Sequence, residues 1–310
     1  MRSTYYSSIL LSAAPLSLAW GDLGHQTIAY IAQNYVSSNT ASWAQGILRD
    51  TSDSYLANVA TWADHYRETR AGHFSEPFHF IDAQDNPPSS CNVNYNRDCG
   101  SGGCVISALQ NYTSRVVDID LSPTEIAYAM RFIVHFVGDM HQPLHDEAGE
   151  RGGNEIKVLF DGSKANLHAI WDTQILEKST GGYGLDVASS WAQNLTSEID
   201  GGAYKKQAAK WIQGIDVGDV VGSVEPWASE ANAYVCSIVI PNGFDAVQGE
   251  DLGENGYYAN ALPTVDLQIA RAGRRLAAWL DAIAASQTQR ADGVGRKVPG
   301  HKTKHHKEEL

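Results

Sequence analysis

Histidine and aspartate recur four residues apart along this chain. His135 and Asp139 form one such pair, and His168 and Asp172 form another within the segment HAIWD. Residues four apart on a helix leave the same face, so each pair presents an imidazole beside a carboxylate. His145 ends the intervening segment HFVGDMHQPLH. Imidazole and carboxylate groups are the ligands that zinc takes in hydrolytic sites, so this pattern predicts metal-assisted hydrolysis.

Other residues extend the candidate ligand set. His25 lies near the expected mature N-terminus, Asp64 ends the segment VATWAD, and His79 lies in FHFID. A hydrogen-bonded core pair would explain any one histidine and aspartate taken alone. Asp139, however, lies in an apolar helix whose only Lys or Arg is Arg131, eight residues away. A buried carboxylate needs compensation, and a divalent cation supplies it directly.

The elements that must position these residues are mostly helical by their periodicity. Strand signal is confined to one short segment that ends in Asp-Gly, which predicts a small hairpin. The expected fold class is therefore all-α, a single mainly helical domain with a small β-hairpin. The expected helices are one that Asp22 caps and that runs through Gln33 and Tyr35, Ile126 to about Met140 (opened by a capping box at Ser122–Glu125), Ala203–Gly214 and Leu267–Ala285, and the expected hairpin begins at Ile156–Phe160.

The two ends of the chain differ in composition from its body. Residues 1–19 have one early charge, a short apolar run and a small-x-small site, which together predict a secretory signal cleaved after Ala19. Residues 286–310 are polar and basic and are expected to be a disordered tail. The expected catalytic domain is 20–285, and the protein is expected to be secreted. Retention in the endoplasmic reticulum through Lys307–Leu310 is the alternative.

Cysteines and glycosylation sequons agree with an oxidising compartment. The chain has four cysteines, an even number. Cys99 and Cys104 enclose a Gly-rich turn and can pair locally, which would leave Cys91 with Cys236, although the sequence alone allows three pairings. Asn111 and Asn194 each begin an Asn-x-Thr acceptor sequence, so both are predicted glycosylation sites.

Composition excludes several classes of protein. The 310 residues are 43% hydrophobic and 19% charged, so the chain can bury a core and is neither disordered nor fibrous. No apolar stretch reaches the ~18–20 residues of a membrane span. The net charge is -13, opposite in sign to that of a nucleic-acid binder that works by counterion release. If the protein handles phosphates, something other than Lys and Arg must supply the positive charge.

Longer segments around the candidate residues carry a family resemblance. They are WGDLGHQTIAYIA, TWADHYRETRAGHFSEPFHFIDA, MRFIVHFVGDMHQPLH, GGNEIKV and NLHAIWD. Over roughly residues 20–285 the chain resembles the fungal zinc-dependent single-strand nucleases, the nuclease S-one and nuclease P-one family. The resemblance implies the helical fold shared with zinc phospholipases C and a site for three zinc ions. The implied ligands are Asp64, His79, His135 and Asp139 for one zinc, Trp20 (through its free α-amine and carbonyl oxygen), His25 and the shared Asp139 for a second, and His145, His168 and Asp172 for the third.

The resemblance also implies a reaction. The paired zinc ions would hold a bridging hydroxide as the nucleophile, and the third would stabilise the leaving 3′ oxygen. The expected enzyme is an endonuclease that hydrolyses single-stranded DNA and RNA to 5′-phosphorylated products and also acts on 3′-nucleotides. No protein partner and no membrane is expected, and a monomer is expected. The implied catalytic residues are Asp64, Arg67 and Asp139, and the implied substrate contacts are Phe80 for base stacking, Asp82 for the base edge and Asn154 for the phosphate or metal-bound water.

Some positions complete or depart from the family pattern. The family disulfides map to Cys91–Cys236 and Cys99–Cys104. Arg151 is a departure, because an apolar residue is usual before Gly-Gly-Asn, and this bears on base preference. The histidines expected outside the ligand set are His65, His73 and His141.

Two alternative functions remain open at the level of sequence. One is a zinc phospholipase C-like phosphodiesterase, which would need a choline-sized pocket and an apolar membrane-facing rim. The other is a non-catalytic secreted zinc-binding glycoprotein, which would be expected to have lost a ligand or Arg67, and none is lost.

Overall fold

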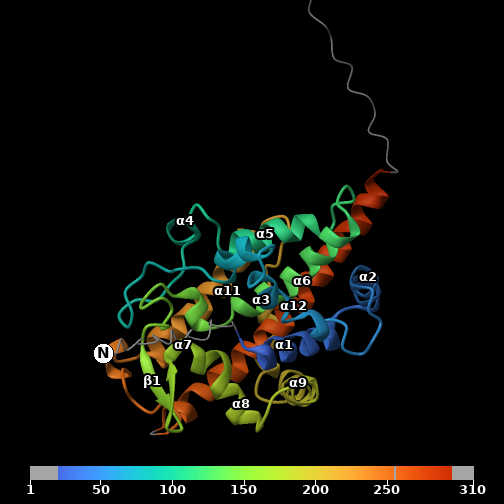
Figure 1. Cartoon of the computed structure of the whole chain (residues 1–310). Helices are drawn as coiled ribbons and strands as arrows, with labels where there is room; N and C mark the ends of the chain where they lie inside the picture. Colours follow the sequence, from blue (N-terminus) through green and yellow to red (C-terminus); the bar gives the residue numbers. More distant parts are fainter. Residues whose placement is uncertain (1–19, 255, 295–310) are drawn as a thin grey trace, which may run out of the picture.

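Helices make up most of the regular structure in the computed structural model, which describes residues 20–254 and 256–294, with side chains to residue 287 (Figure 1). The predicted all-α class with one small hairpin is confirmed. The α-helices are α1 (Asp22–Tyr35), α2 (Ser38–Leu48), α3 (Trp62–Arg67), α4 (Tyr95–Asp98), α5 (Val105–Arg115), α6 (Pro123–Asp139), α7 (Leu167–Ala169), α8 (Ile175–Thr180), α9 (Leu185–Asp200), α10 (Lys205–Trp211), α11 (Val220–Tyr234) and α12 (Tyr257–Val294). Short 3₁₀ or π segments are η1 (Ala57–Val59), η2 (His73–His79), η3 (Pro143–Asp146), η4 (Ile170–Gln174), η5 (Val235–Val239) and η6 (Phe244–Ala246).

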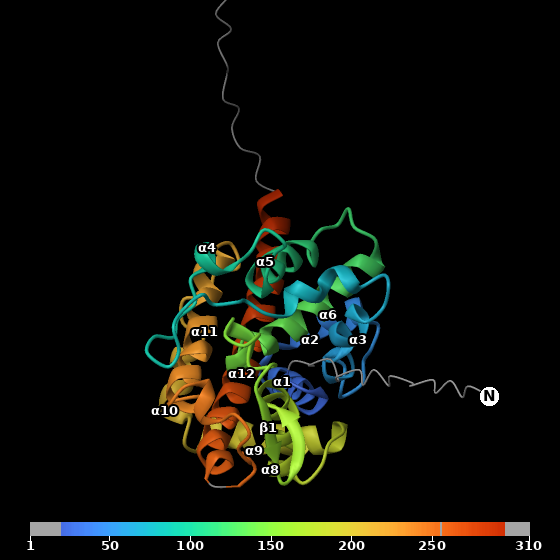
Figure 2. The same ribbon diagram turned by 60° about the vertical axis from the view of Figure 1, so that its left-hand side comes forward.

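The long helix α12 is the element against which several other helices pack. It runs across the fold, and α1, α6 and α9 pack against it (Figures 1 and 2). Gly273 permits the close approach of α12 to α1, because a Cβ there would clash with Cγ2 of Ile31. This packing holds α1 and α6, which carry candidate ligands, in fixed positions over the core.

Helix α6 has the predicted capping box at its start. The Oγ of Ser122 accepts from the backbone N–H of Glu125, and Oε2 of Glu125 accepts from the backbone N–H of Ser122 at 3.2 Å. These two bonds satisfy donors that the first helical turn leaves free. The other end of the helix is buried and carries His135 and Asp139.

Several predicted boundaries differ from those observed. Asp22 lies in the first turn of α1 and Gly21 takes the cap position, without a side-chain cap bond. Helix α10 is shorter than predicted. Helix α12 begins ten residues before Leu267 and continues nine beyond Ala285, to Val294. Its earlier start buries Ala261 and Val265 in the core, and the residues after Ala285 include helix formers and no glycine or proline before Gly293.

The hairpin delivers a candidate ligand to the site. Strand β1 (Lys157–Phe160) pairs antiparallel with β2 (Ser163–Asn166). Asp161 and Gly162 between them have φ of 50° and 76°, as a two-residue type I′ turn requires. Asn166 at the end of β2 caps α7, because its Oδ1 accepts from the N–H of Ala169 at 2.7 Å. His168 therefore follows directly from a fixed strand end.

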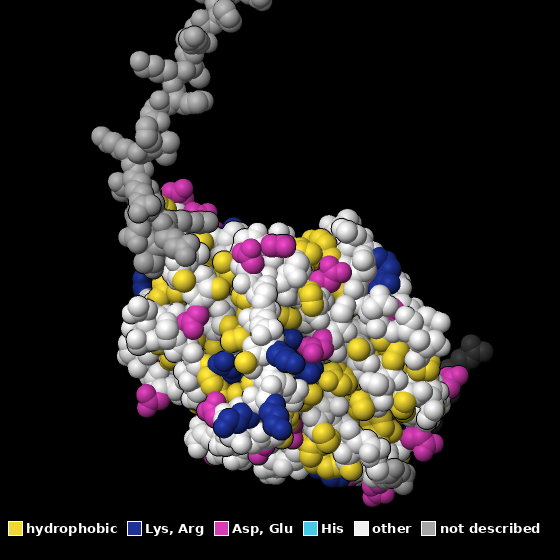
Figure 3. Space-filling model, turned by 180° about the vertical axis from the view of Figure 1, so that it is seen from behind, with side chains coloured by type: hydrophobic (Ala, Val, Ile, Leu, Met, Phe, Trp, Pro, Cys, Tyr) yellow, Lys and Arg dark blue, Asp and Glu magenta, His cyan; other side chains and the backbone are white. Residues whose placement is uncertain are grey.

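Remaining sequence predictions fall partly inside the described residues. Asn111 and Asn194 are both exposed, on α5 and α9. The predicted signal at 1–19 and most of the predicted tail lie outside the described residues. No helix in the described part of the chain is long and apolar enough to cross a membrane. On the face shown in Figure 3, basic side chains gather near the centre and acidic ones lie mostly towards the margin.

Candidate metal centre

The first group of side chains brings together Asp64, His79 and His135 from α3, η2 and α6. Their ligand atoms lie within 4.8 Å of one another, and all three residues are buried. Oδ1 of Asp64 is 3.5 Å from Nε2 of His135 and 3.5 Å from Nδ1 of His79. The Nδ1 of His79 is also 3.0 Å from Oδ2 of Asp139. This arrangement presents two imidazoles and two carboxylates to one point, as a tetrahedral zinc site does.

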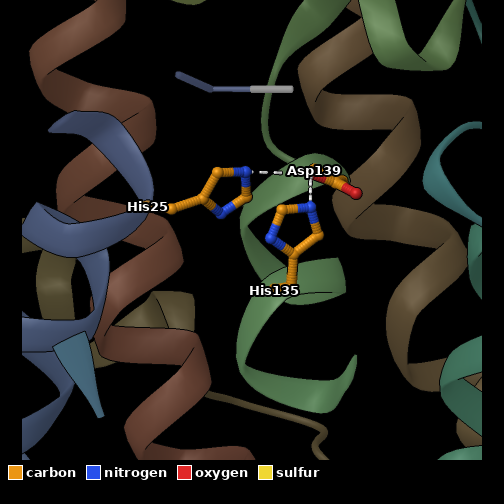
Figure 4. A group of neighbouring side chains, drawn as sticks. All are labelled: His25, His135 and Asp139. Carbon is orange, nitrogen blue, oxygen red and sulfur yellow. Dashed lines mark ion pairs between the residues drawn. The ribbon is translucent and has the colours of Figure 1, made fainter. Parts of the chain in front are cut away.

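Asp139 belongs to two groups at once. Its Oδ1 lies 3.1 Å from Nε2 of His25 on α1 and 3.3 Å from Nε2 of His135, while its Oδ2 faces His79. Figure 4 shows the two imidazoles of His25 and His135 converging on the Asp139 carboxylate. The two rings are stacked with centroids 3.8 Å apart. One carboxylate with an oxygen towards each group has the geometry of a bridge between two cations.

A separate group consists of His145, His168 and Asp172. Nε2 of His168 is 3.4 Å from Oδ2 of Asp172, and Nε2 of His145 is 3.8 Å from Oδ1. These residues come from η3, α7 and η4, and all three are buried. The segment HQPLH and the segment HAIWD, which are far apart along the chain, therefore meet in one site.

The backbone orients most of these imidazoles. Nδ1 of His135 donates to the carbonyl oxygen of Ala60 at 2.7 Å, and Nδ1 of His145 donates to that of His79 at 2.7 Å. Nδ1 of His168 donates to the carbonyl oxygen of Gly152 at 2.6 Å. A carbonyl oxygen can only accept, so the proton is on Nδ1 and the lone pair of Nε2 faces the carboxylates. Metal-binding histidines are commonly held in this way.

Buried polar atoms without hydrogen-bond partners mark the points where these groups converge. They belong to ligand candidates of each group, and atoms of this kind cost free energy unless something pairs with them. A cation placed in each group would pair with the atoms that face that group. The unpartnered atoms that face a group are Nε2 of His25, Oδ1 of Asp64, Nε2 of His135, Oδ1 of Asp139 and Nε2 of His145.

Burial also keeps four of the five candidate imidazoles neutral. It lowers the pKa of His25, His79 and His145 well below their usual range, and that of His168 to about 4. Burial also lowers the pKa of His135, but the Asp139 and Asp64 carboxylates outweigh this effect and raise that pKa to about 9. Neutral imidazole is the form that binds a metal, so a cation at this site must displace a proton from His135. Burial raises the pKa of the Asp139 carboxyl well above its usual range. An ionised Asp139 is therefore unfavourable here unless a positive charge compensates it.

A cleft of about 1010 Å³ opens beside these groups, and His145 and His168 line it. The predicted substrate residues Phe80, Asp82 and Asn154 line it too. Arg67 also reaches the cleft, with a side chain that is 12% exposed and lies 3.4 Å from Oδ1 of Asp64. The structure thus places a cation, an aromatic ring and a carboxylate around the opening to the candidate metal centre.

Phe80 and Asp82 face the cleft because the segment after η2 is extended. Side chains alternate in such a segment, and Ile81 and Ala83 are buried while Asp82 is exposed. The backbone is held on one side by a bond from the N–H of Ile81 to the carbonyl oxygen of His145 at 2.9 Å. The segment that presents the two substrate residues is therefore tied to a candidate ligand.

Trp20 is fully buried just before α1. The N–H of the next residue, Gly21, donates to the carbonyl oxygen of Asp172 at 2.8 Å. A Cβ on Gly21 would lie 2.8 Å from Oγ1 of Thr173, so this position favours glycine. The first residues of the expected mature chain are thus fixed inside the protein, next to η4.

Some residues of the site were not singled out from the sequence. Gln142 donates from Nε2 to Oδ1 of Asp172 at 2.6 Å, and its Oε1 accepts from the N–H of Leu144 at 2.6 Å. It therefore orients a candidate ligand. Its position within HQPLH is the one feature of the sequence that could have pointed to this role. The histidines expected outside the ligand set lie apart from the three groups: His65 and His73 are exposed, and Nδ1 of His141 donates to the carbonyl oxygen of Val137.

The structure contains both implied disulfides, Cys91–Cys236 and Cys99–Cys104. Cys91 also lies next to Asp85 and Glu147, which gives a further group of ligand types. Its sulfur is bonded to that of Cys236, so no thiolate is available there, and this group is not a metal site of the kind described above.

The chain was compared with known proteins. The S1/P1 nuclease family model matches residues 20–285. Nuclease P1 of Penicillium citrinum is 54% identical over 268 residues, which cover 86% of this chain and 99% of the relative. Nuclease S1 of Aspergillus oryzae is 53% identical over 281 residues, 90% of this chain and 96% of the relative. Endonuclease 2 of Arabidopsis thaliana is 32% identical over 290 residues, 88% and 93% respectively. The chain, with its three groups of buried histidine and aspartate, belongs to the S1/P1 nuclease family.

Proposed function

We propose that this protein is a zinc-dependent nuclease that hydrolyses single-stranded DNA and RNA to 5′-phosphorylated products and removes the phosphate of 3′-nucleotides. One observation carries the proposal: the structure has three groups of buried imidazole and carboxylate ligands, and His145 and His168 of one group line a cleft that Arg67 also lines beside Asp64. Membership of the S1/P1 nuclease family supports it. The names of its relatives, nuclease P1 and nuclease S1, point to the same chemistry.

Zinc fits the donor atoms of the three groups. The donors are nitrogen and oxygen, and the donor atoms of each group lie within 4.8 Å of one another. The proposed assignment gives each ion at least three protein donors, counting both the amine and the carbonyl oxygen of Trp20. One zinc is held by Asp64, His79, His135 and Asp139, a second by Trp20, His25 and Asp139, and the third by His145, His168 and Asp172.

Residues at and near the cleft have separate roles in the proposed hydrolysis. Bound zinc supplies Lewis acidity towards the phosphate and lowers the pKa of a coordinated water. Arg67 faces the cleft beside Asp64, where its fixed guanidinium stabilises the negative charge that grows on the phosphate in the transition state. Asp64 holds this guanidinium in place while also serving as a ligand, and Asp139 joins two ligand groups.

Preference for single strands follows from two other side chains that line the cleft, Phe80 and Asp82. A base must leave the duplex stack before it can lie on an aromatic ring. Phe80 offers that ring, and Asp82 on the same extended segment accepts hydrogen bonds from the base edge. Asn154 also lines the cleft, on the turn before β1, where its Nδ2 donates to the carbonyl oxygen of Arg151 at 2.9 Å. This bond leaves its Oδ1 for the substrate or its water.

The N-terminus links the proposed activity to secretion. Cleavage after Ala19 would free the α-amine of Trp20, which is the donor that the second zinc requires. We therefore propose that the active form is the secreted, processed monomer. Retention in the endoplasmic reticulum through Lys307–Leu310 is the competing outcome, which localisation of the full chain would reveal.

Metal analysis combined with a strand-specific assay tests the proposal. The mature chain from Trp20 is assayed for zinc, and then for cleavage of one DNA sequence in single-stranded and double-stranded form, of RNA and of a 3′-nucleotide. We expect about three zinc ions per chain, consistent with the three ligand groups, and cleavage of the single strand that chelation abolishes and zinc restores. Full activity in metal-free protein, or equal cleavage of both DNA forms, would refute the proposal.

A further inference from the structure

Arg151 lies at the rim of the cleft, and the steps proposed above do not use it. Its side chain is 80% exposed and lines the cleft. It forms an ion pair with the exposed Glu155, at 4.0 Å, and such surface pairs are weak. Among the described residues that line the cleft, the Lys or Arg side chains are those of Arg67 and Arg151. The carboxylates lining it are Glu68, Glu76, Asp82 and Glu147.

The two arginines stand at different depths. Arg67 is 12% exposed and lies against Asp64, so its charge acts next to the candidate metal centre. Arg151 faces solvent on the turn between η3 and β1. A polyanion that places one phosphate at Arg67 therefore meets mostly carboxylates along the rest of the cleft, with Arg151 as the basic exception.

The backbone beneath Arg151 is held in place. Arg151 and Gly152 have φ of 55° and 62°, and a non-glycine residue keeps this left-handed conformation only where its surroundings enforce it. The carbonyl oxygen of Arg151 accepts from Nδ2 of Asn154 at 2.9 Å. The carbonyl oxygen of Gly152 accepts from Nδ1 of His168 at 2.6 Å. The turn therefore fixes the base of the Arg151 side chain relative to a candidate zinc ligand.

We propose that Arg151 binds a backbone phosphate next to the scissile one and so favours chain substrates over mononucleotides. The inference rests on the proposed nuclease function. A nucleic-acid strand carries a phosphate at every linkage, whereas a 3′-nucleotide has only the phosphate that reacts. A contact to a phosphate that does not react stabilises the bound substrate and the transition state equally. Arg151 therefore lowers KM for chains and leaves kcat unchanged.

Kinetics of Arg151→Gln on two substrates test this division. On a thymidine trinucleotide, KM should rise about fivefold at low ionic strength, the most that one exposed ion pair usually contributes, while kcat stays the same. On thymidine 3′-monophosphate, neither constant should change. The plot of log kcat/KM against log salt concentration should become shallower by about 0.7 for the trinucleotide, because one phosphate contact is lost. Arg151→Lys keeps the charge and should retain most of the wild-type affinity.

Arg49→Gln is the matched control. Arg49 is an exposed arginine with the same φ of 55°, but it ends α2 and does not line the cleft. It should behave as the wild type on both substrates. Equal KM increases for Arg49→Gln and Arg151→Gln would overturn the inference, because they would show an effect of net charge alone. An equal increase on thymidine 3′-monophosphate would also overturn it.

Substrates in which one phosphate linkage is replaced by a neutral one show which phosphate Arg151 contacts. A trinucleotide that carries a single methylphosphonate, on either the 5′ or the 3′ side of its one cleavable linkage, lacks one charge. For one of these two substrates, the KM of the wild type should rise about fivefold, as the KM of Arg151→Gln does on the normal trinucleotide. The KM of the variant should not rise further on that substrate, because the contact is already absent. If the KM increases from the methylphosphonate and from Arg151→Gln multiply for both substrates, the two changes act independently, and the proposed contact would be overturned. A wild type that cleaves neither the trinucleotide nor the 3′-nucleotide would refute the nuclease function itself, and the inference with it.

Discussion

Asp139 is the residue on which the candidate metal centre depends most. It is fully buried, it faces three imidazoles through its two oxygens, and burial raises its pKa. Its contacts are with imidazoles, while Arg67 lies beside Asp64. A carboxylate shared between two cations accounts for both its burial and its contacts.

Asp139→Asn should remove zinc from both sites that share this residue. The amide is neutral and has one acceptor oxygen, so it cannot bridge two cations. Nuclease activity should fall by more than about a hundredfold, because loss of a group that merely orients a ligand already costs about 10–100-fold. Zinc per chain and cleavage of single-stranded DNA measure the effect. Asp53→Asn, at an exposed position, is the control, and wild-type zinc content in the Asp139 variant would show that it is not a bridge.

Phe80→Ala should weaken substrate binding and leave the metal centre intact. The ring lines the cleft without belonging to a ligand group, and stacking of one base on an aromatic ring contributes about 1–3 kcal/mol. KM for oligonucleotides should therefore rise while zinc per chain stays at the wild-type value. Tyr183, an aromatic residue that is 73% exposed and outside the cleft lining, provides the control Tyr183→Ala. Unchanged KM on several oligonucleotides would exclude stacking on Phe80.

At the scale of elements, α6 connects a surface cap to the buried centre. The capping box at Ser122 and Glu125 starts the helix, and His135 and Asp139 lie one turn apart at its other end. The hairpin β1–β2 performs a similar role for His168, through the cap that Asn166 provides to α7. Local sequence signals thus decide where each ligand-bearing segment begins.

Ser122→Ala should lower stability without changing catalysis. Loss of an N-cap hydroxyl costs about 1 kcal/mol, which corresponds to a decrease of roughly 2–4 °C in Tm for a protein of this size. The cap lies at the end of α6 remote from its ligands, so kcat and zinc content should stay the same. Ser190→Ala, within α9, lacks a capping role and should leave Tm nearly unchanged. A decrease in activity beyond the loss of folded protein would show that the cap also positions the site.

At the scale of the whole molecule, charge and processing both bear on function. The chain has a net charge of -13, so attraction of a polyanion must come from local cations and not from the overall field. The proposed zinc ions supply such charge inside the cleft. The buried start of the described chain, with Trp20 enclosed and Gly21 bonded to Asp172, makes the N-terminus part of the same site.

A mature protein with one extra Gly before Trp20 should be folded but nearly inactive. The extra residue converts the α-amine, whose ordinary pKa is about 7.7–8.0, into an amide nitrogen that is a poor zinc donor. The zinc proposed for Trp20 and His25 should be lost or weakened, while the other two sites are retained. Zinc per chain and cleavage of single-stranded DNA compare the two forms, with circular dichroism as the check on folding. Equal zinc and equal activity would show that Trp20 has only a structural role.

Local sequence determined much of this protein. The capping box at Ser122, the Asp161-Gly162 turn and the four-residue spacing of His135 and Asp139 depend on neighbours along the chain, so each could be predicted. The boundaries of α12 could not, because its earlier start is favoured by burial of Ala261 and Val265 against other elements. Side-chain periodicity does not report such contacts.

Only the tertiary structure decided how the candidate ligands are grouped and oriented. Asp64, His79 and Asp139 come from three separate elements, and their distances depend on how those elements pack on α12 and on one another. The backbone carbonyl groups that orient the imidazoles, such as that of Gly152 for His168, carry no side-chain signal at all. Every residue has a carbonyl group, so the sequence specifies which residues are able to bind a metal, whereas the fold specifies which nitrogen of each imidazole faces the site.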